Sequence, residues 1–254
     1  GWVQNIIPIF TSIAVAVLLT FKFDIDLFAL ILKVFSPIQG FGQTLPGFVL
    51  LIFLMTFFYT LGISHWLWNG IKTPIFMAGI AANIAAVEQG LSATNIATNE
   101  AVFTAGLITM GGMGATLTLN LLMCFSKSKS LKTVGRLSIL PSIFNINEPI
   151  MYSAPIVMNP FLAIPFFLTP VVVAISTYFV IKTGIVPPLN GFACPWTMPA
   201  VISGFLIGGW KMAIWQACTL VISTLIYWPF AKKYDNILVK REAAALKKDE
   251  AEGK

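Results

Sequence analysis

Apolar runs about as long as a bilayer is thick dominate this chain of 254 residues. A helix needs about 20 mostly apolar residues to cross the hydrocarbon core, where every backbone amide must find its partner within the protein. Runs of this kind predict an all-α, polytopic membrane protein with about five spanning helices. The expected spans are residues 5–21, 46–63, 101–125, 155–181 and 201–230.

Charged residues are scarce until the C-terminal end of the chain. They make up 10% of it, against 57% hydrophobic residues, and twelve of them lie from Lys232 onward. The net charge of +6 does not indicate nucleic-acid binding, because the bases flank apolar runs instead of lining a polar surface. Residues 126–136 carry four bases and no acid, which is typical of a cytoplasmic loop. The segment 232–254 is predicted to be a charged, helical, cytoplasmic tail.

Several classes of site are disfavoured by what the sequence contains. Cys124, Cys194 and Cys218 are far apart and form no CxxC pair, and His65 is the one histidine, so neither a disulfide framework nor a metal site is expected. No Walker loop, GxSxG elbow, HExxH helix or Rossmann glycine pattern is present. No cofactor is therefore expected, and a self-contained active site of the soluble kind is not visible.

Three segments do not fit the pattern of simple spans. Residues 74–101 carry several Asn, Gln and Glu side chains, so we expect them to be partly helical and partly exposed to water. Residues 137–152 and 183–200 are too apolar for exposed loops and too rich in Pro, Gly and Asn for regular helices. We expect both to be re-entrant, because irregular backbone at membrane depth occurs only in the protein interior or beside a wet cavity, as in transporters.

The motif NINEP, residues 145–149, lies in the first of these irregular segments. Glu148 is the strongest candidate for chemistry, since an ionisable group at membrane depth costs about 2.5–3.5 kcal/mol and is usually retained for binding or proton transfer. It could instead cap a helix at the interface or pair with Arg136. Asn145 and Asn147 could bind a ligand or simply form a turn, because Asn and Pro both favour turns.

Two ring systems are further candidates. His65 lies in LGISHWLWNG at the end of an expected span, where it could exchange protons near neutral pH or belong to the interfacial belt with Trp66 and Trp68. Trp196 lies in CPWTMP, inside the second irregular segment. Its aromatic face could pack on the apolar face of a pyranose ring, or it could be an ordinary core residue.

Three runs, GISHWLWNGI, NEPIMYSAPIVMNP and PWTMPAVISGFLIGGW, resemble the sugar-translocating IIC component of the phosphoenolpyruvate-dependent phosphotransferase system, in its lactose, cellobiose and diacetylchitobiose branch. The similarity extends from about residue 45 to residue 235. Family members are longer and this chain begins GWVQN, without an initiator methionine or a signal-peptide pattern, so we expect an N-terminal portion to be missing. The family usually shows GIHG where this chain has GISHWLWNG, with the histidine one place later and a tryptophan after it, whereas Glu148 keeps its full motif context.

The resemblance implies a homodimeric permease of the bacterial cell membrane that binds a β-linked disaccharide. The sugar would be released as a 6-phosphate, with the phosphoryl group delivered by a phosphocysteine on a separate IIB protein. Residues 1–44 would end an N-terminal region of the dimerisation type, and residues 45–231 would form the substrate-binding domain. By the same resemblance Glu148 and His65 would contact the hydroxyl that is phosphorylated, and the substrate-binding residues would be Asn145, Asn147, Trp196 and Thr197.

Two other functions fit the same residues. An ion-coupled secondary sugar transporter that does not phosphorylate its cargo would use the irregular segments and Glu148 equally well. A truncated subunit that does not transport is the second alternative.

Overall fold

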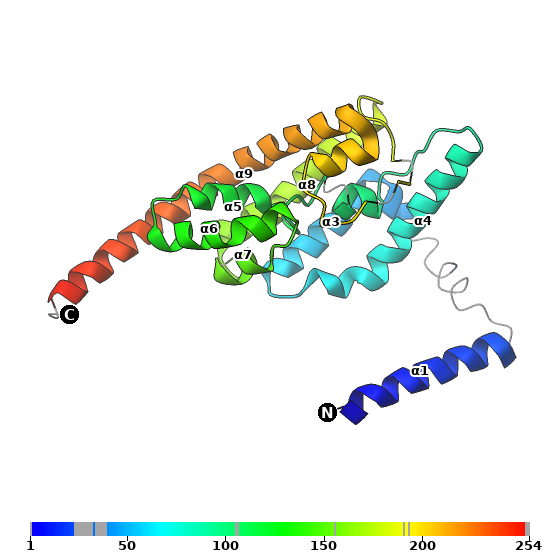
Figure 1. The fold of residues 1–254 in the computed structure, drawn as a ribbon, viewed down its shortest axis with the longest axis horizontal. Helices are drawn as coiled ribbons and strands as arrows, with labels where there is room; N and C mark the ends of the chain where they lie inside the picture. Colours follow the sequence, from blue (N-terminus) through cyan, green and yellow to red (C-terminus); the bar gives the residue numbers. More distant parts are fainter. Residues whose placement is uncertain are drawn as a thin grey trace.

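The computed structural model describes residues 2–22, 33, 40–104, 107–154, 156–189, 191–192 and 194–251. The described part of the chain is helical and contains no β-strand, which confirms the predicted all-α class. Most helices lie side by side in an elongated bundle, and α9 (Ile202–Ala251) runs along it and extends beyond it at the C-terminal end (Figure 1). Helix α1 (Trp2–Lys22) lies apart from this bundle (Figure 1).

Three described helical stretches are long and apolar enough to cross a membrane. The first is the 3₁₀ helix η1 (His65–Trp68) continued by α4 (Asn69–Glu88), and the others are α8 (Pro160–Lys182) and α9. Two shorter apolar helical stretches are Ile6–Lys22, within α1, and α3 (Leu45–Thr60). Helices α8 and α9 begin within five residues of the spans expected at 155–181 and 201–230. Helix α4 covers residues 74–88 of the segment 74–101, and residues 89–98 lie outside any helix, so this segment is partly helical as predicted.

The expected span at 101–125 is not a single helix. Between the π-helix η2 (Glu100–Thr104) and α5 (Thr116–Cys124), residues 107–115 are turns and bends. Gly111 and Gly112 have φ angles of 78° and 100°, a region that an α-helix does not visit and that glycine enters at little cost. The small residues of TMGGMGATLTLN therefore break the helix instead of allowing a continuous one to pack closely.

Large apolar side chains occupy both the inside and the outside of the bundle. Helix α3 packs on α8, α8 packs on α9, and α5 packs on both α6 (Lys129–Ile143) and α9. Phe48, Phe166 and Tyr227 are fully buried between these helices, and the Tyr227 hydroxyl donates a hydrogen bond of 2.7 Å to the Gly114 carbonyl. Many Leu, Ile and Phe side chains remain exposed on the outer faces. A surface of that kind fits hydrocarbon better than water.

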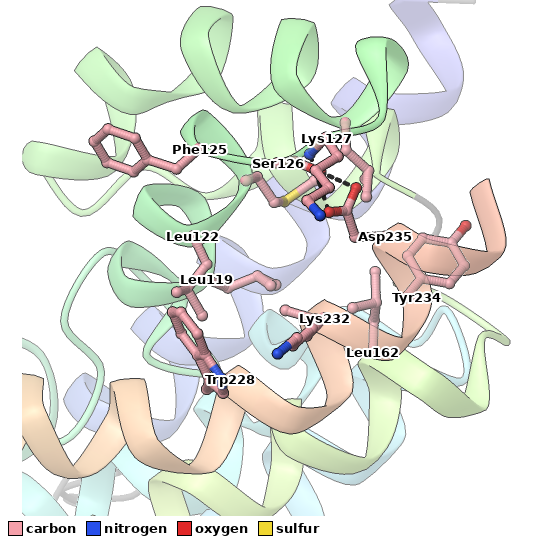
Figure 2. A pocket seen from close by; sticks show the side chains of 13 residues that line it. Leu119, Leu122, Phe125, Ser126, Lys127, Leu162, Trp228, Lys232, Tyr234 and Asp235 are labelled. Atoms are coloured by element: carbon pink, nitrogen blue, oxygen red, sulfur yellow. Dashed lines mark hydrogen bonds between the residues drawn. The ribbon is translucent and has the colours of Figure 1, made fainter. Parts of the chain in front are cut away.

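Two carboxylates on the polar half of α9 hold the loop that precedes α6. Asp235 accepts hydrogen bonds from the Ser126 hydroxyl and from the backbone amide of Lys127 (Figure 2). It also accepts one from the backbone amide of Ser128. Glu242, two helical turns further on, accepts bonds from the Ser128 hydroxyl at 2.6 Å and from the amides of the two residues that follow. The basic loop and the start of the C-terminal tail therefore lie together at one end of the molecule.

A cavity of about 510 Å³ borders this contact (Figure 2). Its wall is mostly apolar and includes Leu119 and Leu122 of α5, Leu162 of α8 and Trp228 of α9. None of the site residues predicted from the sequence lines it.

Candidate functional site

The NINEP motif forms a break between two helices. Helix α6 ends at Ile143, so residues 137–143 are regular helix, contrary to the expectation from the sequence. A short helix α7 (Glu148–Ser153) begins after four intervening residues. Asn145 adopts a left-handed conformation with φ 63°, which Asn tolerates better than most residues. Pro149 lies in the first turn of α7, where its missing N–H has no helical partner to lose. Proline is therefore accommodated in the apolar half of the chain without a broken hydrogen bond.

This break forms one wall of a cavity of about 240 Å³. The cavity also borders η1, the first turn of α4, the glycine-rich stretch before α5, and the irregular segment around Trp196. His65, Glu148 and Trp196, which are far apart in sequence, all line it. Asn145 and Asn147 line it as well, so the structure places five of the six predicted site residues around one space. The sixth, Thr197, is half-buried and is not part of the lining.

Asn145 connects three segments of the chain. Its Oδ1 accepts a bond of 2.8 Å from the amide of Gly111, and its Nδ2 donates to the carbonyls of Trp196 at 2.7 Å and Met198 at 2.9 Å. Both Nδ2 protons are used in these bonds. Asn145 is thus a turn residue whose side chain holds the cavity wall together, and it has little remaining capacity for a ligand.

Asn147 keeps more of its hydrogen-bonding capacity. It is 3% exposed, and its Nδ2 donates one bond of 2.7 Å to the Met113 carbonyl. The second Nδ2 proton and Oδ1 remain for a ligand in the cavity. Gly112 makes this position possible, because a Cβ there would come within 2.6 Å of Asn147 Cγ.

His65 is buried in an aromatic environment. It is 8% exposed, and its ring centroid lies 5.2 Å from that of Tyr59, 5.0 Å from that of Trp66 and 6.3 Å from that of Phe103. Its Nδ1 is buried and has no hydrogen-bond partner among the described residues. A buried polar atom without a partner is costly, and it is therefore typical of a site that a ligand or water completes. Trp66, which is 60% exposed, also lines the cavity, whereas Trp68 packs on Phe58 and does not line it.

Glu148 and Trp196 are exposed members of the cavity wall, as are Trp66 and Thr73. Glu148 is the first residue of α7. It therefore lies at the start of a helix, as expected if it caps one. Glu148 and Arg136 are both described, and they form no ion pair. Trp196 is 51% exposed and lines the cavity, so it is not an ordinary core residue. The Glu148 carboxylate and the Trp196 indole, which come from two separate segments of the chain, are thus both available to a ligand.

Sequence reasoning missed several lining residues, Lys72 above all. Lys72 lies seven residues after His65 and is 6% exposed. In a helix, a seven-residue spacing is close to two turns and places both residues on one face. A lone lysine at that distance from His65, within an apolar run, was therefore the sequence signal that could have indicated Lys72 as a site residue. The other missed polar or aromatic residues of the lining are Asn69, Thr73, Asn99, Phe103 and Thr109.

Comparison with known proteins gives a consistent result. Residues 3–170 match the family model described as Phosphotransferase system, EIIC. The chain is 39% identical over 213 residues to the putative permease IIC component YwbA of Bacillus subtilis (strain 168), covering 82% of this chain and 48% of that protein. It is 36% identical over 215 residues to the PTS system cellobiose-specific EIIC component of Geobacillus stearothermophilus, covering 82% and 47%.

A solved structure has the same fold as well as a similar sequence. The transporter ChbC, the IIC component from the N,N'-diacetylchitobiose-specific phosphotransferase system, is 37% identical to this chain and matches it with a TM-score of 0.77. The match covers 82% of this chain and 49% of that one. The chain spans about half the length, or less, of the curated relatives it matches.

Proposed function

Because the chain belongs to the phosphotransferase system EIIC family, we propose that it is the sugar-binding part of a permease for β-linked disaccharides. The cargo would be of the cellobiose, lactose or diacetylchitobiose type, the classes that the names of several relatives state for those proteins. A phosphorylated IIB protein would be the second substrate, and the sugar would reach the cytoplasm as its 6-phosphate.

The observation that carries the proposal is the composition of the 240 Å³ cavity. One side offers polar groups, from Asn147 and Glu148, and another offers the faces of Trp196 and Trp66. Ligand sites commonly combine apolar and aromatic walls with a few well-placed polar groups. A sugar ring has hydroxyls around its edge and apolar C–H groups on its faces, so it matches a wall of each kind.

The chemistry assigned to this site is a phosphoryl transfer. The S–P bond of the phosphocysteine breaks, an O–P bond forms at the 6-hydroxyl of the sugar, and the thiolate stays on the IIB protein. The hydroxyl proton passes to the Glu148 carboxylate or to the His65 imidazole acting as a general base. Positioning contributes more than base strength, because the transition state of such transfers is loose.

We further propose a topology in which residues 137–152 and 183–200 are re-entrant and the charged tail is cytoplasmic. The break at the NINEP motif and the irregular backbone around Trp196 both border the cavity, as expected for irregular segments at membrane depth. Asp235 and Glu242 accept hydrogen bonds from the basic segment before and at the start of α6, which supports placing this segment and the tail on the same side of the membrane. Basic loops favour the cytoplasmic side. Residues 1–44 would end a dimerisation region, in a homodimer within the bacterial cell membrane.

The test has two steps on the purified protein. A panel of β-disaccharides is first screened for binding, and the bound sugars are then incubated with phosphorylated IIB protein and analysed for the 6-phosphate. Formation of the 6-phosphate supports the proposal. Accumulation of unmodified sugar, coupled to an ion, favours a secondary transporter, and absence of both binding and transport indicates a non-transporting subunit.

Replacing Trp196 with alanine is expected to weaken disaccharide binding about tenfold or more, or about 1.4 kcal/mol. The loss follows from removing the one exposed aromatic face that the irregular segment contributes to the cavity. Isothermal titration calorimetry measures the effect. Trp210→Ala is the matched control, since Trp210 is 63% exposed on α9 and does not line the cavity. Equal losses in the two variants would show that Trp196 has no specific contact with the sugar.

A further inference from the structure

Lys72 is a buried cation without an acidic partner. Its side chain is 6% exposed, and its Nζ lies 4.1 Å from the centroid of the Phe103 ring and 5.6 Å from that of Trp66. Within the part of the chain that the structure describes, Lys72 makes no ion pair and no hydrogen bond. Contacts with two ring faces offset only part of the cost of burying an ammonium group, because each is worth about 0.5–2 kcal/mol.

Folding alone does not explain this lysine. An apolar side chain of similar volume, such as methionine, would occupy the same position without the cost of removing a charge from water. Glu148, on α7, is the acid that shares the cavity lining with Lys72, but the two form no ion pair. Glu100 lies on the neighbouring η2 and is not part of the lining. The positive charge is therefore available to the contents of the cavity.

The surroundings of Lys72 add hydrogen-bonding groups to this charge. Asn69 and Thr73 flank it on the first turn of α4, and both line the cavity. Asn147 and His65 line the same cavity, and the His65 Nδ1 has no hydrogen-bond partner among the described residues. A compact anion would meet one positive charge together with amide and hydroxyl donors here. A lysine acts as a point charge toward phosphate in this way.

We propose that Lys72 forms an anion subsite for the phosphoryl group carried by the 6-oxygen of the sugar. The proposal rests on the function proposed above and adds a residue to it. A neutral disaccharide brings no negative charge to the cavity, whereas the phosphorylated sugar brings a dianion. During transfer, negative charge spreads over the three outer phosphoryl oxygens, and a fixed cation beside them lowers the barrier. Lys72 thus distinguishes phosphorylated from neutral sugar.

The test compares two ligands on the purified protein. Binding of a neutral β-disaccharide and of its 6-phosphate is measured for the unsubstituted protein and for Lys72→Gln. We expect the affinity for the 6-phosphate to fall at least tenfold more than the affinity for the neutral sugar, and Lys72→Arg to restore most of it. Lys182→Gln is the matched control, because Lys182 also lies over a ring, that of Tyr178 at 5.6 Å, but outside the cavity.

Equal losses for the two ligands, or no loss for the 6-phosphate, would overturn the subsite. If Lys72→Gln does not fold, the subsite can still be tested on the unsubstituted protein. Rising ionic strength must then weaken binding of the 6-phosphate more than binding of the neutral sugar. Failure of the proposed function is read separately, as the absence of sugar 6-phosphate after incubation with phosphorylated IIB protein. In that case inorganic phosphate, followed through tryptophan fluorescence, tests the subsite alone: a response that Lys72→Gln abolishes supports it, and no response excludes it.

Discussion

Replacing Glu148 with glutamine is expected to lower the rate of sugar phosphorylation about 100-fold or more, while sugar affinity falls much less. Glutamine keeps the length of the side chain and an acceptor oxygen, but it cannot take up the hydroxyl proton. General acid–base catalysis contributes about 100- to 10,000-fold, and a loose transition state favours the lower part of that range. The measurement is the rate of 6-phosphate formation at saturating phosphorylated IIB protein, with sugar binding determined on the same preparation.

Glu88→Gln is the matched control for this prediction. Glu88 is the last residue of α4, is exposed, and does not line the cavity, so its substitution should leave both quantities unchanged. Loss of sugar binding in Glu148→Gln, with normal transfer to the sugar that still binds, would contradict the assignment of Glu148 as a base. His65 would then be the remaining proton acceptor in the cavity.

The residues that the sequence made conspicuous are those whose chemistry is out of place in an apolar chain. Glu148 is an acid beside a proline, His65 is the one histidine, and Trp196 stands between two prolines. Each is recognisable without knowing what it touches, and all three line one cavity. The all-α class could also be predicted from the sequence, because apolar runs long enough to span a membrane are compatible with few other folds.

What the sequence did not reveal depends on contacts between distant segments. Asn145 was predicted to bind substrate, but its amide is occupied by three backbone groups from two other segments. The stretch 101–125 has the composition of a span, and its glycines can serve either close packing or a helix break. The positive φ angles of Gly111 and Gly112 show that these glycines break the helix. Lys72 was not singled out from the sequence, and only its burial and its place in the cavity lining with His65 mark it.

The cavity depends on Asn145 more than on any residue that faces the ligand directly. Its three hydrogen bonds join the NINEP break to the glycine-rich stretch and to the segment that carries Trp196. In Asn145→Ala these backbone groups lose their partners. Buried groups left unpaired cost about 1–3 kcal/mol each in general, although hydrogen bonds within membrane proteins average nearer 0.6 kcal/mol. The loss of stability should therefore be about 2–5 kcal/mol.

We expect Asn145→Ala to lower the thermal midpoint of the purified protein by roughly 5–10 °C and to abolish measurable sugar binding. Asn83→Ala separates these two effects. Asn83 makes a comparable connection elsewhere, donating to the carbonyls of Asn95 at 2.8 Å and Leu189 at 2.9 Å, and it does not line the cavity. It should lower the midpoint by a similar amount while the folded fraction still binds sugar. Normal binding by Asn145→Ala would mean that Trp196 reaches its position without this side chain, because the remaining packing of the irregular segment would then be sufficient to hold it.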